Sequence, residues 1–178
     1  MATHQAAITA LNAARAGDDA AFGLLLEPLL EPAHRLACGL LHDRQAAEDA
    51  VQEAALKAWR KLAQLREGSE MRPWFLAIVA NECRATRRSR WWSVIRNVER
   101  EPASELRDEA IAAGVELRRA LLAMDPDKRL VLVLHWYLDL PVQEVAAVTG
   151  LSLRGAETRL LRATRELRKR MEASRGRQ

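Results

Sequence analysis

Side chains that can read DNA bases lie on one face of the segment from residue 152 to residue 165. This face carries Arg154, Glu157, Thr158, Leu161, Arg162 and Arg165. In a major groove, arginine bonds guanine edges or phosphate, glutamate accepts from the cytosine amine, and threonine or leucine contacts the thymine methyl group. The alternative is a solvated amphipathic helix that binds nothing. The turn before this segment favours the DNA-binding interpretation.

That turn has helix-starting and helix-ending residues at suitable places. Pro141 can begin a short helix, because its missing N–H would have no partner in the first turn. Gly150 can take the positive φ that ends this helix, and Ser152 can cap the next one. Apolar residues then recur at three- and four-residue steps, at Leu153, Ala156, Leu160, Ala163 and Leu167. A short helix, a tight turn and a basic helix together predict a helix-turn-helix.

A second polar cluster lies in the first half of the chain, on a helix that Asp43 can cap and that runs to about Leu62. One face of this helix carries Glu48, Asp49, Gln52 and Glu53. The helix dipole accounts for an acid at the position of Glu48, but Glu53 lies too far from the N-terminus for that explanation. We call these four residues the acidic patch, and it is a candidate docking surface for a basic partner.

Arginines collect on another predicted helix, which follows a loop at residues 65–71 and begins near Pro73. Its predicted buried stripe is Trp74, Phe75, Ile78, Val79 and Cys83, and the far side carries Asn81, Arg84 and Arg88, with Arg87 nearby. Such a face suits a nucleic-acid backbone. Trp91 and Trp92 end the helix, and they either stack on unpaired bases or pack against protein; the sequence leaves both open.

The elements that position these clusters are helical. Alanine and leucine dominate a chain of 178 residues that is 49% hydrophobic, and no stretch shows sustained Val/Ile/Thr alternation. A helix capped by Asp18 or Asp19 should be broken or kinked by Pro28 and Pro32. We therefore predict an all-α fold of two small helical domains and a flexible linker, divided into an N-terminal arm at 1–17, a first domain at 18–92, the linker at 93–110 and a second domain at 111–173.

The charge is unevenly distributed. The net charge is +4 and the pI is near 9.6, but arginines concentrate between Arg84 and Arg100 and again from Arg154 onward. Two basic clusters separated by a linker suggest two contacts with a polyanion.

Several classes of protein are excluded by what the sequence lacks. Cys38 and Cys83 give no disulfide framework, and Cys38 with His42 has no second pair to close a metal site. The four histidines form no acid–base constellation with carboxylates. No signal peptide or membrane-spanning stretch is present. We expect a soluble cytoplasmic protein that is not an enzyme and needs no metal or other cofactor.

Short motifs in a fixed order resemble a known family. The first domain has Asp19-Ala-Ala-Phe22, Ala47-Glu-Asp-Ala-Val-Gln-Glu53 with Ala58-Trp59, and Trp74-Phe-Leu-Ala-Ile-Val-Ala-Asn81; the second has Arg129-Leu-Val-Leu132, Glu144-Val-Ala146 and Arg159-Leu-Leu-Arg-Ala163. The chain resembles the extracytoplasmic-function (ECF) sigma factors of the sigma-70 family over residues 18–172. Their two domains are called region 2 and region 4.

The resemblance implies a promoter-specificity subunit of RNA polymerase and a role for each cluster. The acidic patch would bind the clamp helices of the largest polymerase subunit. A flipped base of the -10 element would enter the 65–71 loop, and the residues implied for the melted -10 strand are Arg66, Ser69, Asn81, Arg84, Arg87 and Arg88. The residues implied for the -35 element are Ser152, Arg154, Glu157, Thr158, Arg159 and Arg162. The implied partners are core polymerase, through its clamp helices and flap, promoter DNA and an anti-sigma factor.

Two other functions are considered. A stand-alone helix-turn-helix regulator would use its first domain for dimerisation and would bind a palindromic duplex without polymerase. An all-α anti-sigma-type interaction protein would carry both arginine clusters for solubility and would bind no nucleic acid.

The sequence departs from the common pattern of the ECF sigma factors at Ala85, Asp125 and Gly155. These departures make the promoter sequence harder to infer.

Overall fold

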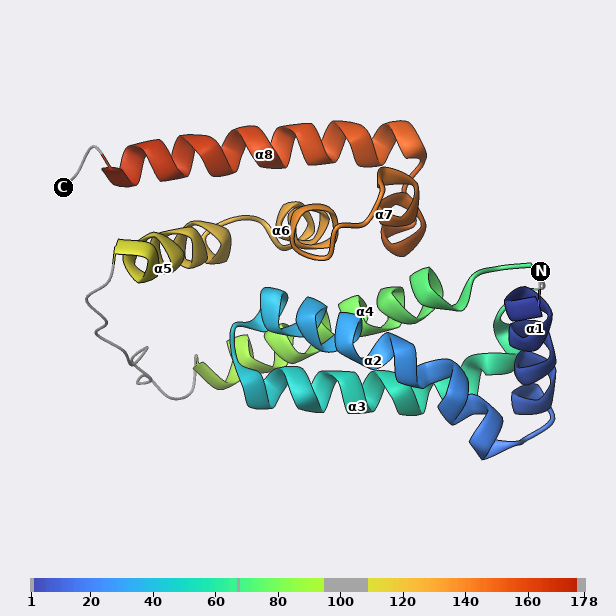
Figure 1. Ribbon diagram of the computed structural model, residues 1–178. Helices are drawn as coiled ribbons and strands as arrows, with labels where there is room; N and C mark the ends of the chain where they lie inside the picture. The colour runs from blue at the N-terminus through green and yellow to red at the C-terminus, as the bar shows by residue number, and fades with distance from the viewer. Residues whose placement is uncertain (1, 67, 95–108, 176–178) are drawn as a thin grey trace. The chain divides into compact units, whose positions relative to one another are not determined.

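The computed structural model describes residues 2–66, 68–94 and 109–175, and all regular elements in these ranges are helical, which confirms the all-α prediction (Figure 1). The chain forms two compact units, Met1–Thr86 and Arg87–Gln178. Their boundary falls inside helix α4 (Met71–Val94), and helix α5 begins at Glu109. The predicted linker at 93–110 is therefore helical at both ends, and its middle, 95–108, lies outside the described residues.

Helix α1 begins the N-terminal unit and packs against it. The helices of this unit, besides α4, are α1 (Ala2–Arg15), α2 (Asp19–Leu41), α3 (Arg44–Lys61) and the short 3₁₀ helix η1 (Leu62–Gln64). α1 contacts α2 and η1, and Ala14 is buried. The segment predicted as an N-terminal arm, residues 1–17, thus contains a helix, and Asp18 caps α2 directly after the turn that follows it.

Helix α2 runs unbroken through Pro28 and Pro32. A proline removes the bond to the carbonyl four residues earlier, which normally breaks or kinks a helix. Pro28 and Pro32 are four residues apart and therefore share one face, and Pro28 is exposed. Freed carbonyls on a solvent-facing side can bond to water, so the helix continues. The break considered for this segment is wrong.

Small side chains bring α2 and α3 together. These helices pack on each other through alanines that are 0% exposed: Ala33, Ala37, Ala47, Ala54 and Ala58. The Asp43 carboxylate accepts from the Ala46 N–H at 2.9 Å, which confirms the predicted cap of α3. The helix ends at Lys61, with Leu62 as its C-cap. The acidic patch thus stands on a helix whose opposite face is fully packed.

The buried stripe of α4 is shifted from the prediction. Phe75, Val79 and Cys83 are buried as expected, and burial raises the pKa of the Cys83 thiol to about 12. Leu76 and Ala80 are buried too, whereas Trp74 and Ile78 are partly exposed. Successive residues of a helix point about 100° apart, since 3.6 residues make a turn. The buried face of α4 is therefore centred on a neighbouring line of residues, which includes Leu76 and Ala80 and leaves Trp74 and Ile78 at its edge.

Three helices of the C-terminal unit follow one another along a fourth, the long helix α8 (Figure 1). The unit consists of α5 (Glu109–Leu122), α6 (Pro126–Leu132), a π-helical turn η2 (Val133–Tyr137), α7 (Val142–Thr149) and α8 (Leu153–Arg175). Trp136, in the π-helical turn, is 68% exposed, whereas Leu134 is buried. A π-helical turn is wider than an α-helical turn, so the side chains there do not follow the 3.6-residue periodicity.

Candidate nucleic-acid interface

Helices α7 and α8 form the predicted helix-turn-helix. Gly150 has φ +70 and its N–H donates to the Ala146 carbonyl, which ends α7. The Ser152 hydroxyl then accepts from the Gly155 N–H at 3.1 Å and caps α8. Pro141 is the residue before α7, one position earlier than the first turn predicted for it. The turn residues therefore act as the sequence indicated.

One side of α8 is buried and the other is free to meet a ligand. Ala156 and Ala163 are 0% exposed, while Leu153, predicted to be buried with them, is 44% exposed because it begins the helix. The exposed side carries every base-reading candidate of the sequence: Arg154, Glu157, Thr158, Leu161, Arg162 and Arg165. A helix packed along one face and polar along the other can lie in a DNA groove.

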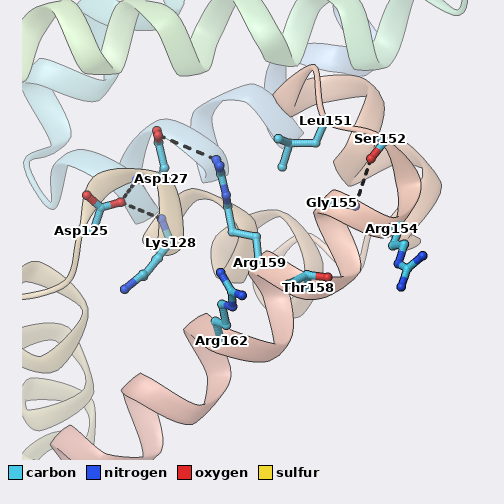
Figure 2. Close-up of a pocket in the computed structure, with 10 residues that line it drawn as sticks. All are labelled: Asp125, Asp127, Lys128, Leu151, Ser152, Arg154, Gly155, Thr158, Arg159 and Arg162. Atoms are coloured by element: carbon cyan, nitrogen blue, oxygen red, sulfur yellow. Dashed lines mark hydrogen bonds and ion pairs between the residues drawn. The ribbon is translucent and has the colours of Figure 1, made fainter.

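A cavity of about 650 Å³ lies at the N-terminus of α8, beside the start of α6 (Figure 2). Five of the six residues predicted to contact the -35 element line it, and Glu157 does not. The lining residues are Asp125, Asp127, Lys128, Leu151, Ser152, Arg154, Gly155, Thr158, Arg159 and Arg162. Four cations, Lys128, Arg154, Arg159 and Arg162, thus meet two carboxylates, Asp125 and Asp127, on one surface, and the excess of positive charge suits a polyanion.

The arginines in this cavity are not equivalent. Arg159 lies 3.8 Å from the Asp127 carboxylate, whereas no ion pair joins Arg154 or Arg162 to any acid in the part of the chain that the structure describes (Figure 2). Asp125 caps α6 by accepting from the backbone N–H groups of Asp127 and Lys128. We therefore expect Arg154 and Arg162 to be more available to a ligand than Arg159.

Gly155 opens the floor of this cavity. A Cβ atom at this position would lie 3.1 Å from the Ser152 hydroxyl oxygen, which is tighter than an ordinary contact. The glycine therefore leaves room for the Ser152 hydroxyl that caps α8. This departure from the family's pattern changes the local shape of the surface without disturbing the helix.

An ionic cluster fixes α8 on α6. The Glu166 carboxylate accepts from the Lys128 ammonium at 2.6 Å and from the Arg170 guanidinium at 2.9 Å. These hydrogen bonds, first from Lys128 and then from Arg170, hold the pKa of Glu166 below its usual range. The cluster thus links the start of α6 to the middle of α8.

Replacing Glu166 with glutamine should remove an acid-sensitive part of the stability of the C-terminal unit. A carboxyl whose pKa is lower in the folded state stabilises that state above its ordinary pKa, about 4.3, and loses this contribution as the pH falls through the folded pKa. We expect the free energy of unfolding of the wild type to fall over this range and that of Glu166→Gln to fall less. Urea unfolding between pH 3 and 7 measures it.

The control for that experiment is Glu172→Gln, which changes an exposed residue of the same helix. Its pH curve should follow the wild type. Parallel curves for Glu166→Gln and the wild type would show that the cluster contributes no pH-dependent stability.

A buried arginine of α6, Arg129, bonds to backbone carbonyls at the end of α5 and just after it. Arg129 is 0% exposed, and its guanidinium donates to the carbonyls of Leu121 (2.7 Å), Leu122 (2.8 Å) and Met124 (3.2 Å). The last carbonyls of a helix lack partners within it, so Arg129 caps the C-terminus of α5. Burial lowers the pKa of Arg129 to about 10, and the side chain stays charged at neutral pH.

Sequence reasoning missed the role of Arg129, although its position contains a signal. A single arginine stands directly before the apolar run of residues 130–134. A charge beside such a run either marks the solvent side of the helix or is buried with partners. The sequence alone does not distinguish these cases, because the carbonyls that it bonds belong to another helix.

The four residues of the acidic patch share one side of α3, as predicted. Asp49, Gln52 and Glu53 are exposed and Glu48 is partly exposed. Each acid has a partner on its own helix: Glu48 pairs with Arg44 at 3.0 Å, Asp49 accepts from Gln45 at 3.1 Å, and Glu53 lies 3.5 Å from Lys57. Glu53 therefore has a local role after all, but exposed pairs of this kind contribute little stability. The patch remains accessible.

Lys57 connects this helix to α4. Its ammonium lies 2.6 Å from the Glu82 carboxylate, and this hydrogen bond is the main cause that raises the pKa of Lys57. The sequence analysis did not identify this pair. It ties the helix of the acidic patch to the helix that carries the arginines.

The residues predicted for the -10 element lie on a loop and on α4. Arg66 and Ser69 are exposed on the loop, where the Ser69 N–H donates to the Arg66 carbonyl at 3.1 Å. Asn81 is exposed on α4 and its side-chain oxygen accepts from Arg84 at 2.8 Å. Arg87 and Arg88 follow along the same helix. The side chains of Trp91 and Trp92 lie outside the described residues.

Among the described residues, no group of three or more His, Cys, Asp or Glu side chains is arranged to hold a metal ion. No described helix is long and apolar enough to span a bilayer.

Family comparison agrees with the motif order. The model of sigma-70 region 2 matches residues 25–93, and that of sigma-70 region 4 matches residues 114–167, together more than two thirds of the chain. The chain belongs to the sigma-70 family. The acidic patch, the 65–71 loop and most of α4 lie in its region 2, and the helix-turn-helix lies in its region 4.

Curated relatives carry the same family name. The chain is 31% identical over 172 residues to the probable RNA polymerase sigma factor RfaY of Xanthomonas campestris pv. campestris. The aligned region covers 87% of this chain and 41% of RfaY. It is 28% identical over 142 residues to the RNA polymerase sigma factor YlaC of Bacillus subtilis, covering 75% of this chain and 82% of YlaC. The chain thus spans less than half the length of RfaY.

Solved structures share the fold. The structure of CnrH in complex with the cytosolic domain of CnrY gives a TM-score of 0.72 at 24% identity over 94% of this chain and 98% of CnrH. The sigma factor RpoE of Bartonella quintana, in complex with the anti-sigma factor NepR, gives 0.64 at 24% identity over 85% and 96%. The predicted order of a region 2-like bundle and a region 4-like helix-turn-helix is therefore confirmed as a fold.

Proposed function

We propose that this protein is an ECF-type sigma factor, which binds core RNA polymerase and directs initiation at promoters with matching -10 and -35 elements. The observation that carries the proposal is the exposed basic side of α8, where five residues predicted for the -35 element line one cavity. The match to sigma-70 region 2 covers the residues of the acidic patch, and it supports the proposed binding of core polymerase. No step needs a catalytic group.

The two halves of the protein have different tasks in this proposal. The acidic patch binds the clamp helices of the largest polymerase subunit, and the region 4 unit binds the flap. Arg66, Ser69, Asn81 and the arginines of α4 hold the melted -10 strand, and α8 reads the -35 duplex. Flipping a base costs a few kcal/mol, which strand contacts offset. Because core polymerase is the proposed partner, we also propose that the protein acts in the cytoplasm.

An anti-sigma factor is the remaining proposed partner. The structural relatives CnrH and RpoE are each described in complex with another protein, the cytosolic domain of CnrY and the anti-sigma factor NepR. A partner of this kind would cover polymerase-binding surfaces of the sigma factor and keep it inactive.

Transcription in vitro tests the proposal. Purified protein is added to core polymerase on fragmented genomic DNA, and run-off products are sequenced. We expect new transcripts that begin at a shared pair of sequence elements, with a spacing that two units can span. Absence of any added transcript would contradict the function, and tight binding to duplex DNA without polymerase would favour a stand-alone regulator instead.

A further inference from the structure

Helix α1 is tied to the loop that follows η1. The guanidinium Nη2 of Arg15 donates a hydrogen bond to the backbone carbonyl of Leu65, fifty residues later in the chain. Leu65 is itself 3% exposed, and its N–H donates to the Leu62 carbonyl at 3.1 Å. The last buried residue before the loop is therefore fixed by α1 through its carbonyl and by η1 through its N–H.

The part of the loop beyond Leu65 is exposed and has few restraints of its own. Arg66, Gly68, Ser69 and Glu70 are exposed, and Gly68 has φ +75 with no atom within 4 Å of a Cβ at that position. The Ser69 N–H, which bonds to the Arg66 carbonyl, closes a turn there. The position of this turn in space therefore depends on what holds Leu65.

The backbone that follows Arg15 is held in place by hydrogen bonds. The N–H groups of Ala16, Gly17 and Asp18 all donate to carbonyls of the last turn of α1, at 3.0 to 3.1 Å. The Asp18 carboxylate then caps α2 by accepting from the Ala21 N–H at 3.0 Å. Because the turn from α1 to α2 is hydrogen-bonded throughout, the guanidinium is anchored to the helical core.

An arginine at position 15 is less favourable for helix packing than an apolar residue would be. Its Nε–H is buried and has no acceptor among the described residues. A buried donor without a partner destabilises a fold, so an apolar side chain would serve simple helix packing better. The benefit of arginine at this position lies in the bond to Leu65.

We infer that α1, through Arg15, positions the loop that receives the -10 base, which makes Arg15 a positioning residue for promoter recognition. This inference rests on the proposed function of the loop. A pocket for an extruded base works best when it is already in place, since ordering it during binding would reduce the affinity.

The test compares Arg15→Met with the wild type, as full chains bound to core polymerase. On a promoter and a panel of -10 variants, we expect the substitution to slow open-complex formation about tenfold and to reduce discrimination among -10 sequences about tenfold, as loss of one charge-assisted hydrogen bond implies. Affinity for core polymerase and discrimination among -35 variants should not change.

A second readout needs no polymerase. We expect the Ser69 amide to exchange hydrogen about tenfold faster in Arg15→Met, with amides of α3 unaffected. Arg35→Met is the matched control, because it removes an arginine from α2 in the same unit, where the guanidinium lies 3.7 Å from the Glu31 carboxylate of its own helix. It should behave as the wild type in both assays.

Arg15→Lys keeps the charge and provides a folded alternative if Arg15→Met does not fold; it should show the same changes at smaller size. Wild-type values of -10 discrimination in both Arg15 variants would overturn the inference, even if Ser69 exchange were faster. Failure of the wild type to initiate at all would instead reject the proposed function, and unchanged Ser69 exchange would then reject the tether as well.

Discussion

Replacing Arg129 with methionine should destabilise the C-terminal unit by about 3 kcal/mol, because it leaves backbone carbonyls without their donor, and a buried acceptor without a partner costs about 1 to 3 kcal/mol. The fully buried guanidinium donates to three carbonyls at the end of α5, and methionine fills the space but donates nothing. A loss of this size is a large part of the 5 to 15 kcal/mol that stabilises an ordinary domain. The melting temperature of the unit should fall by about 12 °C or more.

Thermal unfolding followed by circular dichroism measures this loss, and hydrogen exchange assigns it to α5, α6 and α8 rather than to α3. The matched control is Arg168→Met, which removes the same charge from an exposed position of α8. That change should alter stability by less than about 0.5 kcal/mol. Equal melting curves for the two variants would mean that the three carbonyls do not depend on Arg129.

Replacing Glu53 with lysine should reduce the affinity for core polymerase at least tenfold while leaving the fold intact. The substitution turns the ion pair with Lys57 into a repulsion, but both side chains are substantially exposed and such a pair is worth only about 0.3 to 0.5 kcal/mol. At a docked surface, in contrast, juxtaposed like charges cost several kcal/mol. Stability and binding therefore respond very differently to the same change.

Titration of labelled protein with core polymerase measures the affinity, and circular dichroism checks the fold. Glu31→Lys is the matched control, since Glu31 belongs to a similar pair four residues apart, with Arg35, on α2 of the same unit. Core affinity should be unchanged by it. An equal loss in both variants would indicate a general charge effect, and an unchanged affinity in Glu53→Lys would refute the assignment of the acidic patch.

Local signals in the sequence predicted the helix boundaries well. Asp43, Gly150 and Ser152 act on the backbone within three or four residues, so their roles can be inferred without knowing the rest of the fold. The same holds for the exposed side of α8, whose residues follow a single 3.6-residue period. The helical fold and the arrangement of the helix-turn-helix could therefore be derived from the residues alone.

Contacts between distant residues could not be derived in this way. Arg15 bonds Leu65, Arg129 bonds carbonyls of α5, and Lys57 bonds Glu82, and no local pattern indicates these partners. The burial of Leu76 in place of Trp74 likewise depends on the helix packed against α4. The -10 and -35 roles of individual residues came from family resemblance, and they remain predictions.

The division of the chain inside α4 has a consequence for the order of events during synthesis. Within the N-terminal unit, α1 packs on α2 and α2 packs on α3, so each helix meets its partner soon after both have left the ribosome. Domains generally fold as units, N-terminal first, while the rest of the chain is still being translated. The surface that carries the acidic patch can thus reach its final form before the ribosome has made α8.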